Sequence, residues 1–375
     1  MFSKNIFQNY VLPIATISGS IIGVGFFSLP YIALKSGIWL ILAYFLVLVF
    51  LIILIHLIYG EVALKTPDFK RFPGFVGFHL GKWPGRFSLV SSTLGSFGVL
   101  LVYLIIGSQF LSSVFFPILG GSKLLYVFIY FALASLIIYF GIKIVSKVEL
   151  GVIIFLLLIL LLILIKGFSQ IKIDNLFIGN IDFRIKNLFL PYGAIMFSLW
   201  GTGMIPEVEE MLGKNKKLIK KIVTVAILIP AVIYLFFIFL ILGITGSSTT
   251  ESALVGLKNF LGNGLGSLGI LVGVATTFVG FITLGTTLKK MLIYDLKIKN
   301  FYSWVIACFV PLILFLIGFN SFIGLVSFIG GVLLGIDGIL ILLMYKKIGG
   351  KKIVIYPLTL IFLLGIIYEI VYLNL

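Results

Sequence analysis

The stretch most able to do chemistry in this sequence is a glycine-broken run inside its first apolar segment. Residues 18–31 read SGSIIGVGFFSLPY, with glycines at 19, 23 and 25 and a proline at 30. Glycine weakens a helix, and proline removes one of its hydrogen bonds. Backbone released from a helix at membrane depth is tolerated only where it lines a cavity or is buried in protein, and there it can bind a small polar solute. The run therefore predicts a solute-binding break and favours a transporter.

A second run of the same kind lies in the sixth apolar segment. Residues 197–206 read FSLWGTGMIP, so Gly201, Gly203 and Pro206 again weaken a helix at membrane depth. A single break is more often a packing kink than a binding site, because glycine and proline are frequent in membrane helices. Because the two breaks lie an odd number of segments apart, in segments 1 and 6, these two segments enter the membrane from opposite sides. That arrangement is typical of two inverted five-helix repeats with a solute site between their unwound helices.

Long apolar runs define the architecture that must position these breaks. The chain of 375 residues is 61% hydrophobic, with a mean hydropathy of +1.27, unlike any soluble domain of this length. We therefore predict an all-α polytopic membrane protein with about 11 transmembrane helices, two inverted five-helix repeats and broken helices 1 and 6. The predicted helices span about 10–36, 38–64, 86–116, 122–141, 146–166, 188–211, 218–245, 264–292, 301–319, 321–345 and 353–373.

The whole chain, 1–375, is predicted to form a single membrane transport domain. The first repeat covers about 10–166, the second about 188–345, and an extra helix follows at about 353–373. With a cytoplasmic N-terminus, 21 of the 28 Lys and Arg residues fall on the cytoplasmic side, as the positive-inside rule requires. The C-terminus is then extracytoplasmic, and the lean loops favour the plasma membrane of a prokaryote. The net charge of +16 comes from these loops and does not indicate nucleic-acid binding.

Four stretches carry a resemblance to a known group of proteins. The run 19–25 followed by Leu29-Pro30-Tyr31 is similar to the first helix of amino-acid permeases of the amino acid–polyamine–organocation superfamily. The amino acid/auxin permease branch, which includes aromatic amino-acid permeases, looks closest. The stretches 59–61 (YGE), 200–207 (WGTGMIPE) and 275–280 (ATTFVG) agree with it. The resemblance implies a leucine/sodium-transporter-like fold and alternating access, with helices 1, 2, 6 and 7 moving against the rest.

The two breaks offer complementary groups to an amino-acid zwitterion. A half-helix beginning near Gly25 presents N–H donors and a positive dipole end to a carboxylate, and the carbonyls near Ser198 suit an ammonium. No charged side chain falls in either break, which favours a neutral amino acid, and several aromatic residues favour an apolar or aromatic side chain. With 37 phenylalanines in the chain, aromatic neighbours also arise by chance. The predicted substrate-binding residues, several of them implied by the resemblance, are Ile22, Gly23, Val24, Gly25, Phe197, Ser198, Leu199, Trp200 and Gly201.

The resemblance also implies a sodium site between helices 1 and 8. The candidate ligands are Gly19, Ile22, Gly273, Thr276 and Thr277. Alternatively, both threonines bond back to their own helix carbonyls. Some relatives run on protons and carry a lysine in helix 5, whereas residues 151–165 here are apolar, which favours sodium slightly. A proton relay through Asp337 or His56 is the other option, although for each residue a structural polar contact is favoured over proton transfer.

These patterns predict ion-coupled uptake of a neutral amino acid. The alternative is an amino-acid-sensing membrane receptor of the same superfamily without net transport. An enzyme is not expected, because the sequence holds no Walker loop, zinc-ligand spacing or histidine cluster. We expect a small-molecule amino acid and the lipid bilayer as partners, no nucleic acid, and no cofactor other than a coupling sodium ion; the oligomeric state stays open. Near the cytoplasmic face, four carboxylates fit either inner-gate ion pairs or interfacial solvation: Glu61, Glu207, Glu209 and Glu210.

Overall fold

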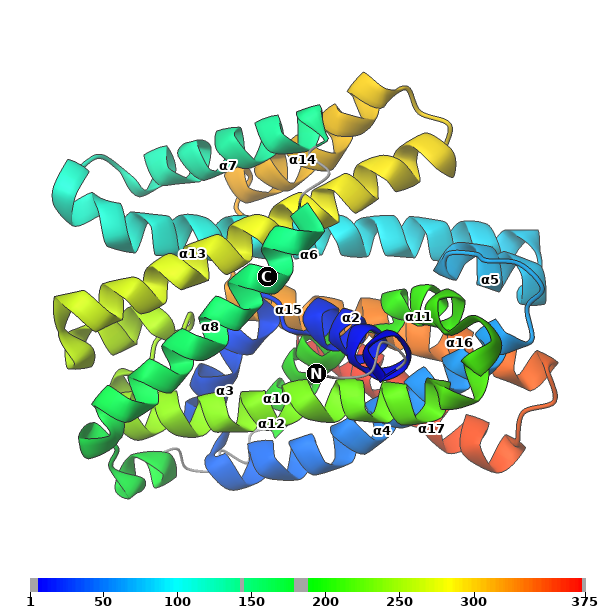
Figure 1. The fold of residues 1–375 in the computed structure, drawn as a ribbon, viewed down its shortest axis with the longest axis horizontal. Coiled ribbons are helices and arrows are strands. Elements are labelled where there is room, and N and C mark those ends of the chain that lie inside the picture. The colour runs from blue at the N-terminus through cyan, green and yellow to red at the C-terminus, as the bar shows by residue number, and fades with distance from the viewer. Residues whose placement is uncertain (1–5, 142–144, 179–187, 373–375) are drawn as a thin grey trace.

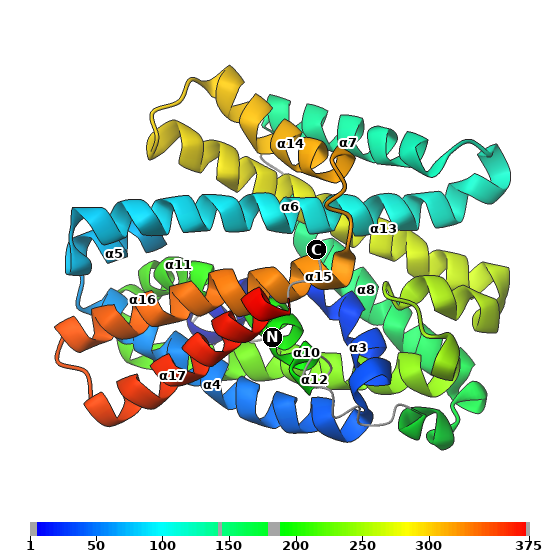
Figure 2. The same ribbon diagram turned by 180° about the vertical axis from the view of Figure 1, so that it is seen from behind.

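The protein is a bundle of helices, several of which are interrupted. The computed structural model describes residues 6–141, 145–178 and 188–372, and no strand occurs among them. Figures 1 and 2 show long helices running side by side, with short helices crossing the middle of the bundle. In chain order the elements are η1 (Phe7–Val11), α2 (Leu12–Ile21), η2 (Gly25–Ser28), α3 (Leu29–Ser36), α4 (Ile38–Leu64), α5 (Phe72–Leu80), α6 (Lys82–Leu119), α7 (Lys123–Phe140), α8 (Val145–Gly167), η3 (Phe168–Gln170), η4 (Ile173–Phe177), α10 (Leu190–Leu199), η5 (Thr202–Met204), α11 (Ile205–Leu212), η6 (Gly213–Leu218), α12 (Ile219–Thr245), η7 (Gly246–Ser248), α13 (Leu254–Tyr294), α14 (Asn300–Leu316), α15 (Phe322–Phe328), η8 (Ile329–Leu333), α16 (Leu334–Lys347) and α17 (Lys352–Val371).

The predicted membrane segments are helical, but they do not all pass as single spans. Within the described ranges, seven helices are long and apolar enough to cross a bilayer, or eight if the bent pair Phe7–Ile21 and Gly25–Ser36 forms one span. The helices Ile154–Gln170 and Asn300–Leu316 are apolar but shorter, and the sixth segment is divided between α10 and α11. The predicted total of eleven therefore stays a prediction.

Segments five apart in the chain pack against one another. The two halves of broken helix 1, α2 and α3, contact α11 and α10, the two halves of broken helix 6. Helix α4 packs on α12, and α6 packs along α13. Such pairing is expected where two repeats of inverted topology enclose a common centre. The repeat itself, and the division of the chain at about 166 and 188, stay predictions.

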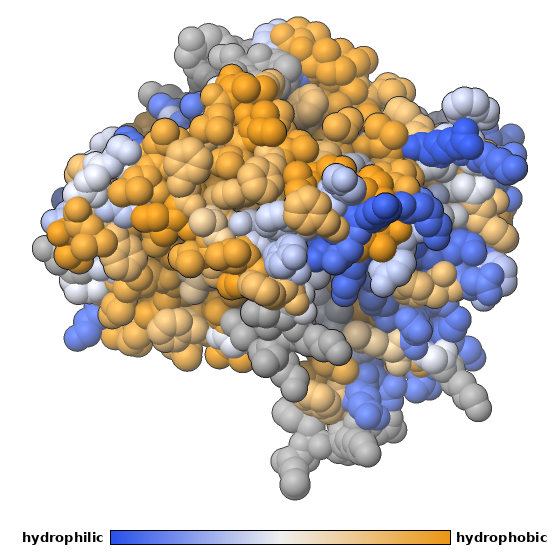
Figure 3. Space-filling model, turned by 90° about the horizontal axis from the view of Figure 1, so that it is seen from above, coloured by the Kyte–Doolittle hydropathy of each residue, from blue (hydrophilic) through white to orange (hydrophobic). Residues whose placement is uncertain are grey.

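The polar residues gather at one end of the bundle. The turns that join α11 to α12, α13 to α14 and α16 to α17 lie at the same end as α5, on the right in Figure 1. In the space-filling view the hydrophilic surface is concentrated at that end, while an apolar surface covers much of the remainder (Figure 3). Large side chains such as Leu46 and Ile353 are 79% and 81% exposed, as expected of a surface that faces lipid. All of these turns belong to the set that the charge pattern assigns to the cytoplasm.

Candidate functional site

The first helix breaks where its glycines predict. Helix α2 ends at Ile21, and Ile22 leaves the helical conformation with φ −73° and ψ 84°. The chain resumes as one 3₁₀ turn, η2, before α3 begins at Leu29 with Pro30 in its first turn. The two halves are bent by 50° relative to each other. Pro30 suits that position because the first turn of a helix has no partner for its N–H.

The sixth segment breaks in the same way. Helix α10 ends at Leu199, Trp200 is extended, and a 3₁₀ turn leads into α11. His56 of α4 stabilises this break: its Nε2 accepts a hydrogen bond from the Gly201 N–H at 3.0 Å, and its Nδ1 lies 2.7 Å from the Ile52 carbonyl oxygen. These two contacts fix the neutral tautomer with the proton on Nδ1. His56, for which the sequence favours a structural hydrogen bond over a proton-carrying role, lies here as a buried partner of unwound backbone.

The two breaks touch each other inside the bundle. A Cβ at Gly25 would lie 2.6 Å from a ring carbon of Phe197 and 2.7 Å from Ser198 Oγ. Likewise, a Cβ at Gly201 would lie 2.7 Å from the side chain of Ile21. Glycine is therefore required at both positions by the close approach of the opposite break. All nine predicted substrate-binding residues lie in these two facing segments.

Two tyrosines that sequence reasoning missed complete the centre of the site. The Tyr234 hydroxyl of α12 is buried within hydrogen-bonding distance of two carbonyl oxygens, 2.8 Å from Ile21 and 3.1 Å from Ser198. The Tyr103 hydroxyl of α6 lies 2.8 Å from where a Cβ at Gly23 would be. Ser198 Oγ is buried and has no hydrogen-bond partner among the described residues. Nothing in the sequence distinguishes these two tyrosines from the other 14.

A small cavity lies between broken helix 1 and α13. Its volume is about 20 Å³, enough for one water-sized species. Gly19, Ile22 and Thr276 line it, together with Val279 and Gly280. The predicted sodium ligands are thus only partly brought together.

The other two predicted sodium ligands do not line this cavity. A Cβ at Gly273 would meet Phe110, on the side of α13 that faces α6. The Thr277 hydroxyl donates to carbonyl oxygens of its own helix, 2.9 Å away at Gly273 and 3.0 Å away at Val274. Thr276 also bonds back, to the Val272 carbonyl oxygen at 2.8 Å, although it lines the cavity. The self-bonding alternative therefore describes both threonines in this conformation.

Asp337, the other predicted proton-relay residue, lies in α16 among polar atoms that lack partners. Its Oδ1, the Tyr59 hydroxyl of α4 and Glu207 Oε2 of α11 are all buried without a hydrogen-bond partner in the described part of the chain. Both carboxyl groups act electrostatically on Tyr59. The structure thus gathers three polar side chains from three helices, of which sequence reasoning weighed two separately.

Two of the four carboxylates expected near the cytoplasmic face form ion pairs. Glu61 pairs with Lys65 at 3.2 Å, one helical turn away on α4. Glu209 at the end of α11 pairs with Lys216 in η6. Both lysines are about half exposed, so each pair contributes at most about 1 kcal/mol to stability.

Replacing Gly25 by leucine is expected to weaken substrate binding strongly while leaving membrane insertion intact. The new side chain would occupy the space of Phe197 and Ser198, and overpacking of about 1–3 kcal/mol corresponds to a loss of about 5- to 150-fold in affinity. Gly203→Leu is the matched control, because a Cβ there has no neighbour within 4 Å. Binding of a labelled amino acid to the purified variants is the measurement. Equal affinities of the two variants would contradict the site.

Replacing His56 by leucine is expected to destabilise the protein by about 1–3 kcal/mol, because the buried Gly201 N–H loses its acceptor. The midpoint of thermal unfolding of the purified protein measures the effect. His79→Leu is the control, since that partly exposed ring on α5 pairs with a side-chain hydroxyl, Thr66 Oγ1 at 2.9 Å, rather than with a backbone N–H of a broken helix. Equal midpoints for both variants would rule out the role given to His56.

Comparison with known proteins supports this assignment of the breaks to a transporter fold. The chain is similar to Mhp1, a nucleobase-cation-symport-1 family transporter solved in a closed conformation with bromovinylhydantoin bound, at 13% identity over 96% of this chain and 90% of Mhp1, with a TM-score of 0.61. It is also similar to MhsT in complex with L-phenylalanine, at 15% identity over 99% of both chains and a TM-score of 0.57. A manganese transporter of Eremococcus coleocola matches at 11% identity over 97% of this chain and 87% of that one, with a TM-score of 0.65.

At these identities the likeness shows a shared fold. No individually curated protein matches this chain. A family model, in contrast, covers nearly all of it: the model described as the tryptophan/tyrosine permease family matches residues 8–367. The superfamily expected from the sequence agrees with this match, and the narrower amino acid/auxin branch stays a prediction. The chain belongs to the tryptophan/tyrosine permease family.

Proposed function

We propose that this protein takes up a neutral amino acid with an apolar or aromatic side chain by ion-coupled alternating access. The observation that carries the proposal is the contact between the two breaks, where Gly25 of η2 meets Ser198 in the last turn of α10, inside the bundle. Unwound backbone at this depth, buried in protein, is the arrangement that transporters use for small polar solutes. The family and the structural neighbours, all transporters, favour transport over sensing.

Each break supplies one half of a zwitterion site. The half-helix that resumes at Gly25 directs its first N–H groups and the positive end of its dipole at the break, where a carboxylate gains charge-assisted hydrogen bonds. The last carbonyl oxygens of α10, together with the unpartnered Ser198 hydroxyl, suit the ammonium group. A compact amino acid can therefore satisfy both segments at once.

The surroundings of the site favour an apolar side chain. Phe26 packs against Tyr234 at 5.4 Å and Phe237 at 4.8 Å between ring centroids. Phe27 packs against Phe110 at 5.2 Å. Such a cluster stabilises an aromatic ring more than a charged group. The family description and the phenylalanine bound to MhsT agree with this choice of substrate.

Sodium is the coupling ion that we propose, bound in the small cavity by carbonyl oxygens of Gly19 and Ile22 with the Thr276 hydroxyl. A proton carried by Asp337 is the alternative, supported by its buried Oδ1, which has no hydrogen-bond partner among the described residues. We further propose a plasma-membrane location with the lysine-rich end of the bundle in the cytoplasm.

The function is tested by uptake of labelled tryptophan, tyrosine, phenylalanine and leucine into proteoliposomes, with sodium and proton gradients imposed separately. We expect saturable uptake driven by inward sodium. If protons alone drive uptake, the cavity assignment is wrong and Asp337→Asn should remove the coupling. Specific binding without uptake under either gradient would instead identify a receptor.

Thr276→Ala is expected to weaken sodium activation by about tenfold, equivalent to about 1.4 kcal/mol, because one of the proposed oxygen ligands is lost. Thr277→Ala is the matched control, since its hydroxyl faces away from the cavity and should leave sodium activation unchanged. The sodium concentration for half-maximal uptake is the readout. A larger effect at Thr277 than at Thr276 would mean that α13, the eighth predicted helix, is rotated during transport so that Thr277 faces the ion.

A further inference from the structure

The last helix, α17, inserts a carboxyl group into the bundle beside the first half of broken helix 6. Glu369 is only 5% exposed, and its Oε1 accepts a hydrogen bond from the Ser327 hydroxyl of α15 at 2.8 Å. A carboxylate inside a membrane bundle is costly unless a cation or several donors neutralise it. Neither the solute site nor the ion cavity described above uses this residue.

The carboxyl group occupies a slot made by two glycines. A Cβ at Gly193 of α10 would lie 2.8 Å from Glu369 Oε1, and a Cβ at Gly331 of η8 would collide with Glu369 Cγ. Gly193 also faces Gly330, where a Cβ would collide with the Gly193 carbonyl oxygen. The absence of side chains at these positions leaves room for Glu369.

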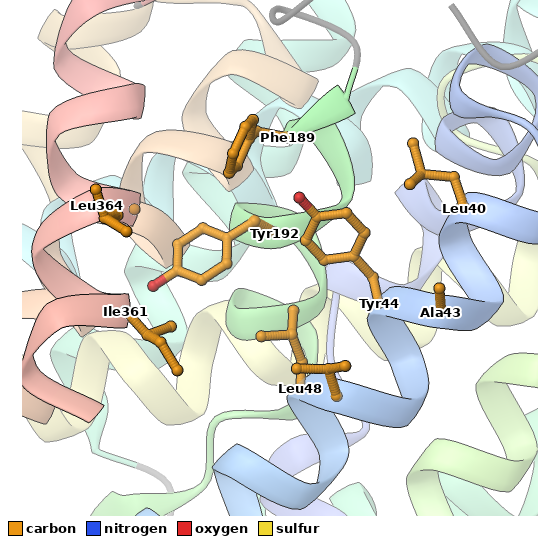
Figure 4. A pocket seen from close by; sticks show the side chains of 10 residues that line it. Leu40, Ala43, Tyr44, Leu48, Phe189, Tyr192, Ile361 and Leu364 are labelled. Carbon is orange, nitrogen blue, oxygen red and sulfur yellow. The ribbon is translucent and has the colours of Figure 1, made fainter. Parts of the chain in front are cut away.

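The slot belongs to a seam that joins α10 to α17. Phe189 stacks on Tyr368 with ring centroids 4.9 Å apart, Tyr192 packs over Gly365, and Gly193 meets Glu369. On each chain segment these contacts are spaced i, i+3 and i+4, so both helices present a single face to the other. Figure 4 shows Phe189 and Tyr192 reaching from α10 toward α17, beside a cavity of about 370 Å³ that is lined by residues of α4, α10 and α17.

Glu369 takes part in none of the ion pairs formed within the described ranges. The titratable groups that interact with it are tyrosines, Tyr192 on α10 and Tyr368 on α17. Neither α15 nor η8 contains a titratable residue. The environment therefore stabilises the neutral acid over the carboxylate.

We infer that Glu369 is a proton-binding site whose protonated form holds the first half of broken helix 6 against α17. Loss of the proton to water leaves a charge facing two glycines and one hydroxyl. Glu369 lies two residues before the end of α17, so the route to water that this inference requires runs past the last turn of that helix. The seam then opens and α10 is released. This inference rests on the proposed function only for its consequence, that a released α10 opens the solute site.

The test measures the movement of α10 without any substrate. The single native cysteine is removed by Cys308→Ala, and a reporter, Leu190→Cys, is labelled by a maleimide in detergent micelles over a range of pH. A second reporter at an exposed position, Glu251→Cys, corrects for ionisation of the thiol itself. We expect the ratio of the two labelling rates to rise with pH, by at most about tenfold per pH unit because one proton controls the step.

Glu369→Gln should keep the ratio low at every pH, because the amide mimics the neutral acid. Glu210→Gln, at an exposed position of α11, is the control and should keep the pH response. Ser327→Ala should move the rise to higher pH, because the carboxylate loses its donor. A Glu369→Gln variant with the parent's pH response would overturn the inference. If that variant does not fold, an unmoved response in Ser327→Ala would overturn it too.

The labelling assay tests the proton site and the uptake assay tests the proposed function, so either result can be negative without the other. A pH-dependent ratio without uptake under either gradient would contradict the proposed function and leave the proton site standing. Uptake together with a labelling ratio that does not change with pH would support the proposed function and overturn the proton site.

Discussion

The fold depends on satisfying backbone groups that two interrupted helices release inside a membrane. Each unpaired N–H or C=O in an apolar medium costs several kcal/mol, so every released group must find a partner within the protein or in a bound solute. Here the partners come from intact neighbouring helices: His56 of α4 serves Gly201, and Tyr234 of α12 serves the ends of α2 and α10. The continuous helices therefore act as the scaffold on which the broken ones are stable.

The breaks were predictable because glycine and proline act on the backbone of their own segment. Gly23, Gly25 and Gly201 lie where the helices unwind, and Pro30 and Pro206 begin the helices that follow. The partners of that backbone were not predictable in the same way. Tyr103 and Tyr234 lie in ordinary apolar helices, and only the packing of α6 and α12 turns them toward the centre.

In α13, the eighth predicted helix, the sequence could not show which face points at the cavity. The spacing Gly-x-x-Thr-Thr occurs at 273–277, but the residues that line the cavity, Thr276, Val279 and Gly280, have the same i, i+3, i+4 spacing one turn later. A helix repeats its faces about every turn, so a spacing identifies a face only when its rotation is known. Glu369 was not predicted for a related reason: the space that its carboxyl group occupies is formed by glycines at 193 and 331 in two other helices.

The hydroxyl of Tyr234 carries one hydrogen and lies between two carbonyl oxygens, one on each broken helix. That hydrogen can point at only one of them at a time. When one helix end moves away, the hydrogen can stay with the carbonyl oxygen of the other, so the hydroxyl still makes one hydrogen bond. Tyr234 can therefore pass its single hydrogen from one broken helix to the other. One side of the solute site can separate from α12 while the other stays attached.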